Sequence, residues 1–442
     1  MAEIRPFRGV RYNQKLVKDL AAVLCPPYDV ISPEEQQACC QRSDCNIIHL
    51  EHGRELPGDG PGDNKYTRAA ASLQDWLSLG ILQADDEPAL YLHNHYFSYR
   101  GERKKRQGIM ARVRLEEWER GGIRPHECTL AAAKDDRLNL LRACKANLSP
   151  VFGLYDDPER KVASLLAREE RAGPLVSMTD SQGQSHEVWA LTQPEVIHQV
   201  AGILADKPIY IADGHHRYET ALAYRREQHT SHPGSTGNQA FDFVMMTLVD
   251  ISDPGLLILP LHRLVQGIPQ STVAGLRNEL EAFFELKALP LAGIDNPGWA
   301  DALSAENENE IVIGLFGLDP EHLFRLTLPD SARIQHMMPG EHCRAYRRLD
   351  VSVLEHVVLG GMLGISDREE DRQAVLAYSS DEVDALRRVM AEEYQLLFLL
   401  NPIGVRSVKA IADAGDRAHP KSTYFYPKPP TGLVINRLEA EL

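Results

Sequence analysis

The 442-residue sequence contains few cysteines and no long hydrophobic run. Its seven cysteines are a small and odd number for this length, which is typical of reduced thiols in the cytoplasm rather than of a disulfide framework. No segment approaches the roughly 18 to 20 apolar residues that a membrane span needs. Residues 1–12 include Arg5, Arg8 and Arg11 and lack the apolar centre of a secretory signal. We therefore expect a cytoplasmic protein with no membrane association.

Positive charge is also in short supply. The sequence has 48 Lys and Arg residues against 63 Asp and Glu residues, which gives a formal net charge of -15. Because such a surface repels polyanions, we expect no nucleic-acid partner. A small phosphate-containing ligand can still bind in a local basic pocket, and a homo-oligomer is compatible with this composition. The length indicates two or three domains, and the 43% of hydrophobic residues is ordinary for a globular protein.

Several motifs of common enzymes are missing. The sequence contains no GxxxxGK[ST] loop, no GxGxxG after a strand, no HExxH and no GxSxG. By motif, it is therefore neither an ordinary P-loop protein nor a Rossmann protein, and it lacks the usual hydrolase signatures. Cysteines and histidines gather between Cys39 and His52, but no CxxC pair is present. We expect no metal site of zinc type there.

The sharpest positive signal is the run Asp213-Gly214-His215-His216-Arg217, which follows the short apolar strand pattern 209–212 and precedes a helical pattern over 218–228. The first amides of a helix have no intrahelical acceptor, and they carry the positive end of the helix dipole. Together with the histidines and Arg217, they would form a cradle for a phosphate. In the alternative interpretation, Asp213 caps the helix and the histidines bind nearby backbone. Adjacent histidines diverge on a helix, so a metal site is disfavoured.

A second group of polar residues lies near the C-terminus. Lys421, Ser422 and Thr423 precede three aromatic residues and Lys428. Such a set could bind a phosphorylated ligand that carries a planar base. The alternative is a sheet strand with one polar face.

Two further groups are weaker candidates. Pro26-Pro27-Tyr28-Asp29 is a stiff turn, and Asp29 could accept a proton or hold Mg²⁺ or could be a simple acid at a helix entry. His126 and Glu127 follow a proline kink and precede the charged segment 134–137. For that segment we favour the interpretation of a solvated helix face.

The coarse pattern is that of a mixed α/β protein. Residues 90–99 and 109–118 predict an antiparallel ribbon, residues 46–51 predict a strand, and residues 380–399 predict one helix. We divide the chain into a core of residues 1–265, a smaller α/β unit of residues 266–345 and a C-terminal segment of residues 346–442 that packs back on the core.

Six segments of the sequence form a characteristic pattern, in the order 26–31, 63–69, 126–127, 147–153, 212–221 and 420–428. Together they resemble domain-of-unknown-function family 1015 along essentially the whole chain. More distantly, the strand–Asp-Gly-His-His-Arg–helix element resembles the ParB/sulfiredoxin-like superfamily and its free-serine kinase branch. This wider resemblance implies a phosphate-binding core with insertions, in which Asp213 lies near the substrate hydroxyl or the metal.

The resemblance also implies roles for the other candidates. It places His215, His216 and Arg217 on nucleotide phosphates, with ATP or ADP and Mg²⁺ as cofactors. No glutamate of this sequence aligns with the kinases' catalytic glutamate, so we take Asp29 as its substitute. The full set of candidate phosphate- and nucleotide-binding residues is Gly214, His215, His216, Arg217, Thr220, Lys421, Ser422 and Thr423.

The expected function is phosphoryl transfer between a nucleotide and a small hydroxyl metabolite, with free serine or phosphoserine as the first substrate to test. Three alternatives belong to other classes. The first is a nucleotide-binding regulatory switch without small-molecule chemistry. The second is sulfiredoxin-like redox repair, which is disfavoured because His215 stands where that chemistry needs a cysteine. The third is a purely structural or interaction protein.

Overall fold

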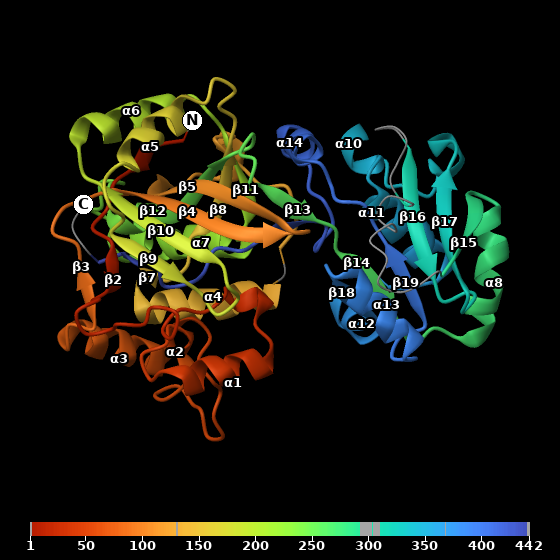
Figure 1. The fold of residues 1–442 in the computed structure, drawn as a ribbon, viewed down its shortest axis with the longest axis horizontal. Coiled ribbons are helices and arrows are strands. Elements are labelled where there is room, and N and C mark those ends of the chain that lie inside the picture. Colours follow the sequence, from red (N-terminus) through yellow and green to blue (C-terminus); the bar gives the residue numbers. More distant parts are fainter. Residues whose placement is uncertain (1, 130, 292–302, 304–309, 367, 440–442) are drawn as a thin grey trace. The chain divides into compact units, whose positions relative to one another are not determined.

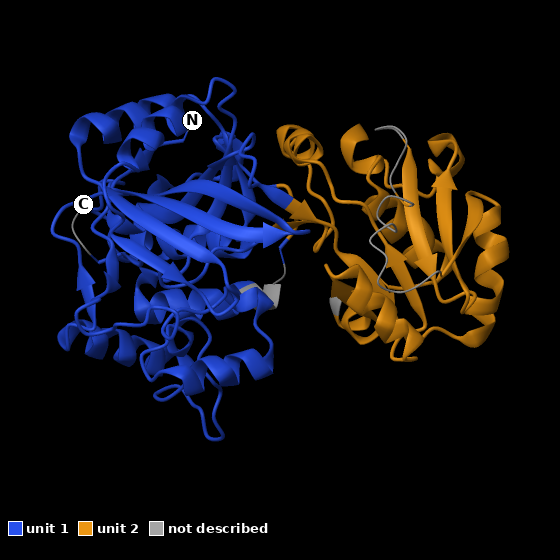
Figure 2. Ribbon diagram, in the orientation of Figure 1, with its two compact units in different colours: residues 1–125, 129–257, 427–442 blue, residues 126–128, 258–426 orange. Residues whose placement is uncertain are grey.

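The computed structural model describes residues 2–129, 131–291, 303, 310–366 and 368–439, and the chain divides into two compact units (Figure 1, Figure 2). Unit 1 comprises residues 1–125, 129–257 and 427–442, and unit 2 comprises residues 126–128 and 258–426. The boundaries thus differ from those expected after residues 265 and 345. Most of the predicted C-terminal segment shares a unit with residues 266–291 and 310–345, and residues 292–302 and 304–309 lie outside the described part of the chain.

A nine-stranded sheet forms the centre of unit 1. Its strands are β1 (Ile4–Arg5), β4 (Leu90–Tyr99), β5 (Glu102–Arg114), β6 (Ile123–Arg124), β8 (Val151–Tyr155), β9 (Val176–Thr179), β10 (Ser185–Leu191), β11 (Ile209–Asp213) and β12 (Phe243–Asp250). They follow the order β6-β11-β8-β12-β5-β4-β10-β9, and β1 pairs with β5. The pairs β6–β11 and β8–β12 are parallel, and the other pairs are antiparallel.

Helices cover both faces of this sheet. They are α1 (Pro33–Arg42), α2 (Ile48–Glu51), α3 (Lys65–Ser78), α4 (Ala131–Cys144), α5 (Lys161–Glu169), α6 (Pro194–Ala205) and α7 (His215–Ser231). In Figure 1, α5 and α6 lie on one side of the sheet, and α3 and α4 lie on the other. Neighbouring sheet residues therefore alternate between two cores: Met245 belongs to the same hydrophobic cluster as Leu73 of α3, whereas Met246 belongs to the cluster that contains Leu166 of α5.

Two small strand pairs complete unit 1. β2 (Val10–Tyr12) pairs with β3 (Leu82–Ala84), and β7 (Ala146–Asn147) pairs with β21 (Asn436–Arg437). The buried Arg112 donates to Asn436 Oδ1 at 2.7 Å. These contacts anchor the end of the chain in the same unit as its beginning.

Local sequence explains several elements of unit 1. The predicted ribbon corresponds to the β4–β5 hairpin, in which residues 91–99 pair with residues 102–110. Its second strand begins at Glu102 and ends at Arg114, earlier than the predicted segment 109–118. Ser32 and Glu35 form a capping box at the start of α1, and Asn64 caps α3 by accepting from the amides of residues 66 and 67. The strand predicted over residues 46–51 is wrong, because α2 occupies this segment. Asn46 Oδ1 accepts from the Ile48 amide at 2.9 Å, which bends the chain into a buried helical turn.

Unit 2 contains a six-stranded antiparallel sheet of order β15-β17-β16-β19-β14-β18. Its strands are β14 (His262–Val265), β15 (Glu285–Pro290), β16 (Ile311–Phe316), β17 (His322–Leu328), β18 (Leu376–Ser379) and β19 (Leu396–Leu399). The helices are α8 (Gln270–Glu281), α10 (Arg344–Arg347), α11 (Asp350–Val353), the π-helix η5 (Leu354–Met362), α12 (Glu369–Val375), α13 (Glu382–Met390) and α14 (Val405–Asp413). β13 (Leu257–Leu259) pairs with β20 (Tyr424–Tyr426).

The single helix predicted over residues 380–399 is wrong. The helix α13 ends at Met390, and Glu392 takes the left-handed conformation with φ +60°. Residues 396–399 then form β19, which is buried at every position and hydrogen-bonds to β14 and β16 on its two edges. Pairing on both edges satisfies the backbone of this apolar segment inside a sheet.

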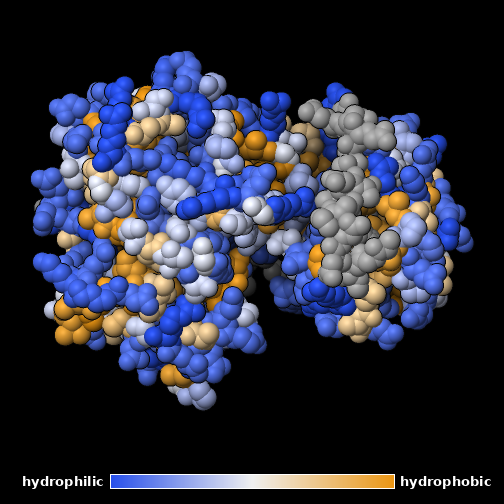
Figure 3. Space-filling model, in the orientation of Figure 1, coloured by the Kyte–Doolittle hydropathy of each residue, from blue (hydrophilic) through white to orange (hydrophobic). Residues whose placement is uncertain are grey.

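The structure confirms the mixed α/β class, with a larger sheet in unit 1 and a smaller one in unit 2. Within the described residues, no helix has both the length and the apolar character to cross a membrane. The face drawn in Figure 3 is mostly hydrophilic, with hydrophobic residues scattered among polar ones, as the composition leads us to expect.

Candidate functional site

The Asp-Gly-His-His-Arg element lies where β11 gives way to α7 in unit 1. β11 ends at Asp213, and Gly214 takes the left-handed conformation with φ +90°. A residue with a side chain rarely adopts this conformation, so glycine permits the sharp turn. The first helical hydrogen bond runs from the Tyr218 amide to the Gly214 carbonyl at 3.0 Å. The positive end of the α7 dipole therefore lies next to the Asp213 carboxylate.

Two cations hold Asp213. Arg217 Nη2 donates to Asp213 Oδ2 at 2.6 Å, and Lys428 Nζ donates to Asp213 Oδ1 at 2.6 Å. Lys428 also pairs with the carboxylate of Asp29 on the 3₁₀ turn η1 (Tyr28–Val30). The Lys428 side chain is only 8% exposed, whereas Asp29 is 24% exposed and Asp213 is 18% exposed. We call these four residues, Asp29, Asp213, Arg217 and Lys428, the Asp213 network.

Charges within the Asp213 network shift the pKa values of Asp213 and Lys428. Burial alone would raise the pKa of Asp213, but the positive charges of Lys428 and Arg217 hold this pKa well below its usual range. Burial would likewise lower the pKa of Lys428, and the two carboxylates instead raise it above its ordinary value. Next to Asp29, burial raises the pKa of Tyr28 to about 12, so its phenol stays neutral. The charges of Asp213 and Lys428 therefore stabilise each other.

Arg217 folds back over the turn from which its helix starts. A Cβ placed on Gly214 would lie 3.0 Å from Arg217 Nε, so the glycine also makes room for this side chain. Arg217 Nη1 donates to the carbonyl of Pro150, and its buried Nε has no hydrogen-bond partner among the residues that the structure describes. A buried donor without a partner costs free energy and marks a place where an acceptor would bind favourably.

A small polar cavity of about 50 Å³ borders Arg217. Its polar lining residues are Glu51, Arg137, Asn147, Ser149, Arg217 and Thr220. The volume is enough for a few water molecules. Thr220 reaches this cavity from the second turn of α7, although its hydroxyl donates to the His216 carbonyl at 2.6 Å.

The cavity wall carries a second buried set of charges. Glu51 accepts from Ser149 Oγ at 3.0 Å and lies 3.5 Å from Arg137 Nη1. Burial raises the pKa of Glu51 in spite of the charge of Arg137. The guanidinium of Arg137 also stacks on Tyr28, 4.1 Å from the ring centroid. Arg137 is 6% exposed, so the interpretation of residues 134–137 as a solvated helix face is wrong for this residue.

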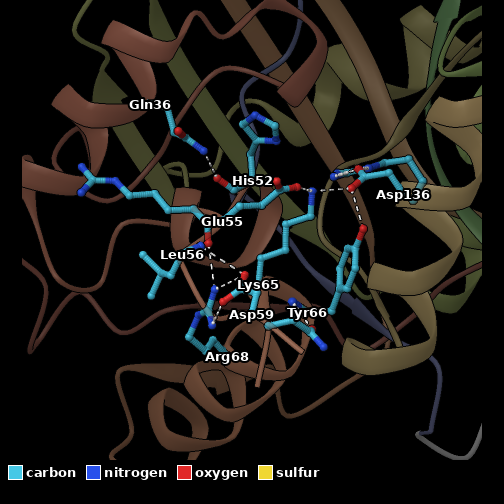
Figure 4. Close-up of polar contacts among 12 residues, drawn as sticks. Gln36, His52, Glu55, Leu56, Asp59, Lys65, Tyr66, Arg68 and Asp136 are labelled. Atoms are coloured by element: carbon cyan, nitrogen blue, oxygen red, sulfur yellow. Dashed lines mark hydrogen bonds and ion pairs between the residues drawn. The ribbon is translucent and has the colours of Figure 1, made fainter. Parts of the chain in front are cut away.

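Figure 4 shows the continuation of these contacts towards α3. Asp136 Oδ1 accepts from Tyr66 OH and from Lys65 Nζ at 2.8 Å each. Lys65 also binds Glu55 at 2.9 Å, and Arg68 binds Asp59 at 2.8 Å. The segment 63–69 thus supports the loop in front of α3 and the charged residues of α4 through ion pairs.

The remaining sequence candidates gather in unit 2. His126 Nε2 lies 2.9 Å from Thr423 Oγ1, and Glu127 accepts from the Lys421 amide at 2.9 Å. Ser422 is buried, and its hydroxyl donates to the His419 carbonyl at 2.6 Å. The segment 421–428 therefore divides between the units, because Lys421, Ser422 and Thr423 join His126 and Glu127 while Lys428 joins Asp213.

The sequence candidates of unit 1 fall into two groups. Asp29, Asp213 and Arg217 come together, with Gly214 providing the turn between them. His215 is buried at the first position of α7, and His216 is half-buried beside it.

Sequence reasoning missed Lys428, Glu51 and Arg137 as members of the site. Lys428 lay in the segment singled out near the C-terminus, Arg137 lay in the segment 134–137 interpreted as a solvated helix face, and Glu51 lay in the predicted strand 46–51.

The chemistry open to this arrangement follows from its charges. Arg and Lys are the side chains that bind phosphate oxygens, and carboxylates are the ligands that Mg²⁺ prefers. Within the described residues, no group of three or more His, Cys, Asp or Glu side chains could hold a metal ion alone. A metal that uses Asp29 and Asp213 would therefore need further oxygen ligands, such as phosphate oxygens or water.

A family model described as "Protein of unknown function (DUF1015)" matches residues 4–352. The chain belongs to this family. A search of curated proteins found no match.

Among solved structures, a free serine kinase in complex with AMP has 13% identity and a TM-score of 0.37 and covers 75% of this chain and 92% of its own. A conserved hypothetical protein from Pyrococcus furiosus has 13% identity and a TM-score of 0.35, with 73% and 93% of the two chains covered. SbnI with a C-terminal truncation, from Staphylococcus aureus, has 9% identity and a TM-score of 0.33, with 73% and 85% covered.

Proposed function

We propose that this DUF1015 protein is a nucleotide-dependent phosphotransferase that acts on a small hydroxyl metabolite, with free L-serine as the first substrate to test. The observation that carries the proposal is the Asp213 network. It joins two cations and two carboxylates at the N-terminal end of α7, beside an unpartnered arginine Nε. Phosphoryl transfer depends mainly on positioning and on neutralising phosphate charge, and these residue types serve both needs.

When a nucleotide binds, the ion pairs within the Asp213 network can be replaced by ion pairs with the nucleotide and its metal. Lys428 and Arg217 now neutralise Asp213. A nucleotide phosphate offers these two cations alternative oxygen acceptors. Mg²⁺ bound by Asp213, with phosphate oxygens and water as its further ligands, would neutralise phosphate charge. This exchange keeps every charge compensated, so it avoids the cost of leaving a buried charge unpaired.

The proposed reaction is a direct displacement at phosphorus. The hydroxyl oxygen of the substrate attacks the terminal phosphorus of ATP or ADP, and the bond from that phosphorus to its bridging oxygen breaks. ADP or AMP leaves with the bond's electron pair. The hydroxyl proton passes to the Asp29 carboxylate, and Lys428 stabilises the charge that develops on the leaving oxygen.

A nucleotide-binding switch is the second candidate function, and the position of Arg217 favours it. The side chain lies over Gly214 and donates to the Pro150 carbonyl. A ligand that takes the place of this carbonyl must move Arg217, so binding would be coupled to a local rearrangement. Such a protein would bind nucleotide saturably without phosphorylating serine.

The test is to incubate the protein with L-serine, Mg²⁺ and either ATP or ADP and to measure phosphoserine by ³¹P NMR and mass spectrometry. We expect turnover, and we expect Asp213→Asn to lower it about 100-fold or more. Lys161→Met is the matched control, because Lys161 is exposed and forms an ion pair with the neighbouring Glu159. Phosphoserine formation no greater than that of Asp213→Asn would refute the kinase proposal. Saturable binding without turnover would then favour the switch.

A further inference from the structure

Three residues at the C-terminal end of α7 form a hydrogen-bonded chain. Ser235 Oγ lies 2.6 Å from His229 Nδ1, and His229 Nε2 lies 2.6 Å from Asp242 Oδ1. His229 belongs to the last turn of α7, Ser235 lies in the loop that follows, and Asp242 ends the 3₁₀ turn η3 (Ala240–Asp242). All three residues belong to unit 1.

The hydrogen bonds among Ser235, His229 and Asp242 orient His229 as a base. Asp242 is completely buried, and its carboxylate accepts the Nε2–H of the imidazole. That tautomer leaves the lone pair of Nδ1 facing Ser235 Oγ, which donates its proton along this bond. A hydroxyl, an imidazole and a buried carboxylate in this order are the groups that activate a serine nucleophile.

Neighbouring residues fix the geometry. Asp242 Oδ2 accepts from the Gln239 amide at 2.8 Å, and Arg225 Nε donates to Oδ1 at 3.1 Å. The ring of Phe241 meets the His229 imidazole edge to face, with centroids 5.3 Å apart. These contacts hold the carboxylate and the imidazole in place before any ligand binds, as preorganised catalytic groups require.

Ser235 opens onto a cavity of about 660 Å³. This volume is typical of small-molecule sites. Tyr224, Phe241 and Leu438 form an apolar part of its wall. Gln228 and Gln239 line the same cavity, and each of them carries a side-chain amide. Their N–H groups are of the kind that stabilises an oxyanion.

We propose that Ser235 is the nucleophile of a second site, which hydrolyses carboxylic esters with a small apolar acyl group. Ser235 Oγ attacks the ester carbonyl carbon while its proton moves to His229 Nδ1. The C–O bond to the alcohol then breaks, and the alcohol leaves with that proton. Water attacks the acyl-serine with His229 again as the base, which releases the carboxylic acid and restores the serine.

This site is independent of the proposed phosphotransferase function. The two sites lie at opposite ends of α7, a helix of 17 residues that is about 25 Å long. They share no residue.

The first experiment labels the intact protein with a fluorophosphonate probe and locates the modified residue by mass spectrometry. We expect the label on Ser235, and we expect Ser235→Ala to abolish it. His229→Gln should slow labelling about 100-fold or more because it removes the base. Ser231→Ala is the matched control, since Ser231 is an exposed serine at the end of the same helix.

The second experiment measures hydrolysis of p-nitrophenyl butyrate by the same variants, after circular dichroism has confirmed that each one is folded. We expect Ser235→Ala and His229→Gln to lose the activity and Ser231→Ala to keep it. Unchanged hydrolysis in folded Ser235→Ala would overturn the proposal. So would labelling of Ser235 that does not depend on His229, because a serine that merely ties the loop to the helix needs no base.

Discussion

Each unit contains a carboxylate held between two cations, and the two arrangements differ in burial. In unit 1, Asp213 lies between Arg217 and Lys428, with side chains 18%, 12% and 8% exposed. In unit 2, Glu355 lies between Arg263 and Arg372, with side chains 2%, 0% and 7% exposed. Glu355 belongs to the π-helix η5, whereas Asp213 ends a strand at the start of a helix.

This difference separates a structural ion pair from an exchangeable one. Removing one partner of a fully buried ion pair leaves an uncompensated charge, and no solute can reach it as a replacement. The Asp213 network is partly accessible and borders a polar cavity through Arg217. We therefore expect that a ligand can replace the ion-pair partners within this network. We expect the Glu355 cluster to govern the stability of unit 2 and the Asp213 network to govern binding.

The largest effect is expected from Glu355→Gln. This change leaves Arg263 and Arg372 buried without their shared counter-charge, so it should destabilise unit 2 by about 3–5 kcal/mol. Hydrogen exchange measured by mass spectrometry should show the loss of protection in β14 and η5. Protection in β11 and α7 should stay as in the unsubstituted protein. A loss of protection below about 1 kcal/mol in unit 2 would contradict the structural role of Glu355.

The next effect concerns nucleotide binding. Lys428→Met removes a cation that we assign to phosphate, so the Kd for ADP with Mg²⁺ should rise about 10- to 100-fold, or about 1.4–2.8 kcal/mol. Isothermal titration calorimetry measures this change. Lys161→Met, at an exposed pair, should leave the Kd unchanged. Equal affinities for the two variants would show that Lys428 does not contact the nucleotide.

A smaller effect is the opposite response of the two units to acid. The pKa of Asp213 is lowered in the fold, so its contribution to stability is present above its unfolded pKa of about 3.9 and is lost as the pH falls through its folded value. In unit 2, burial raises the pKa of Asp350 to about 6. Its ionisation therefore costs stability above about pH 6, and this cost disappears as the pH falls towards about 4.

Hydrogen exchange measured at several pH values, corrected for the intrinsic exchange rate, tests this response. In the unsubstituted protein, the protection of unit 2 should rise as the pH falls from 7 to 4, and Asp350→Asn should abolish this rise. Below pH 4, the protection of unit 1 should fall, and Asp213→Asn should make this fall less steep. The same pH dependence in the protein and in both variants would contradict these assignments.

The smallest effect belongs to a helix cap outside both networks. Asn64→Ala removes the acceptor for the amides of Tyr66 and Thr67 at the start of α3, which should cost about 1 kcal/mol of unfolding free energy. Chemical denaturation measures this cost. The Kd for ADP should not change, and a change of tenfold would mean that α3 is coupled to the Asp213 network.

Short-range patterns explain how much of this molecule the sequence could predict. The β4–β5 hairpin and the β11–α7 turn follow from local residue patterns, and both are present. The prediction of a strand over residues 46–51 was wrong because the apolar alternation of this segment also suits a short buried helix. Asn46 initiates this helix through its side chain. The predicted end of the helix over residues 380–399 was wrong because residues 396–399 form β19. This strand gains its backbone partners from β14 and β16, which are distant in sequence.

The site was predictable in part for the same reason. Asp29, Asp213 and Arg217 stood out through local motifs, but their meeting depends on the tertiary fold. Lys421 and Lys428 looked equivalent in sequence, and they separate because the chain passes from unit 2 to unit 1 between residues 426 and 427. The sequence could not predict the burial of Arg137 against Tyr28, because other charged residues precede and follow Arg137 in the same helix.

The most direct test of an exchangeable Asp213 network is a crystal structure of the protein with ADP and Mg²⁺. We expect phosphate oxygens within hydrogen-bond distance of Arg217 and Lys428, and we expect the contact between Lys428 and Asp213 to be broken. A nucleotide bound elsewhere, with Lys428 still on Asp29 and Asp213, would contradict the assignment of this network to phosphate.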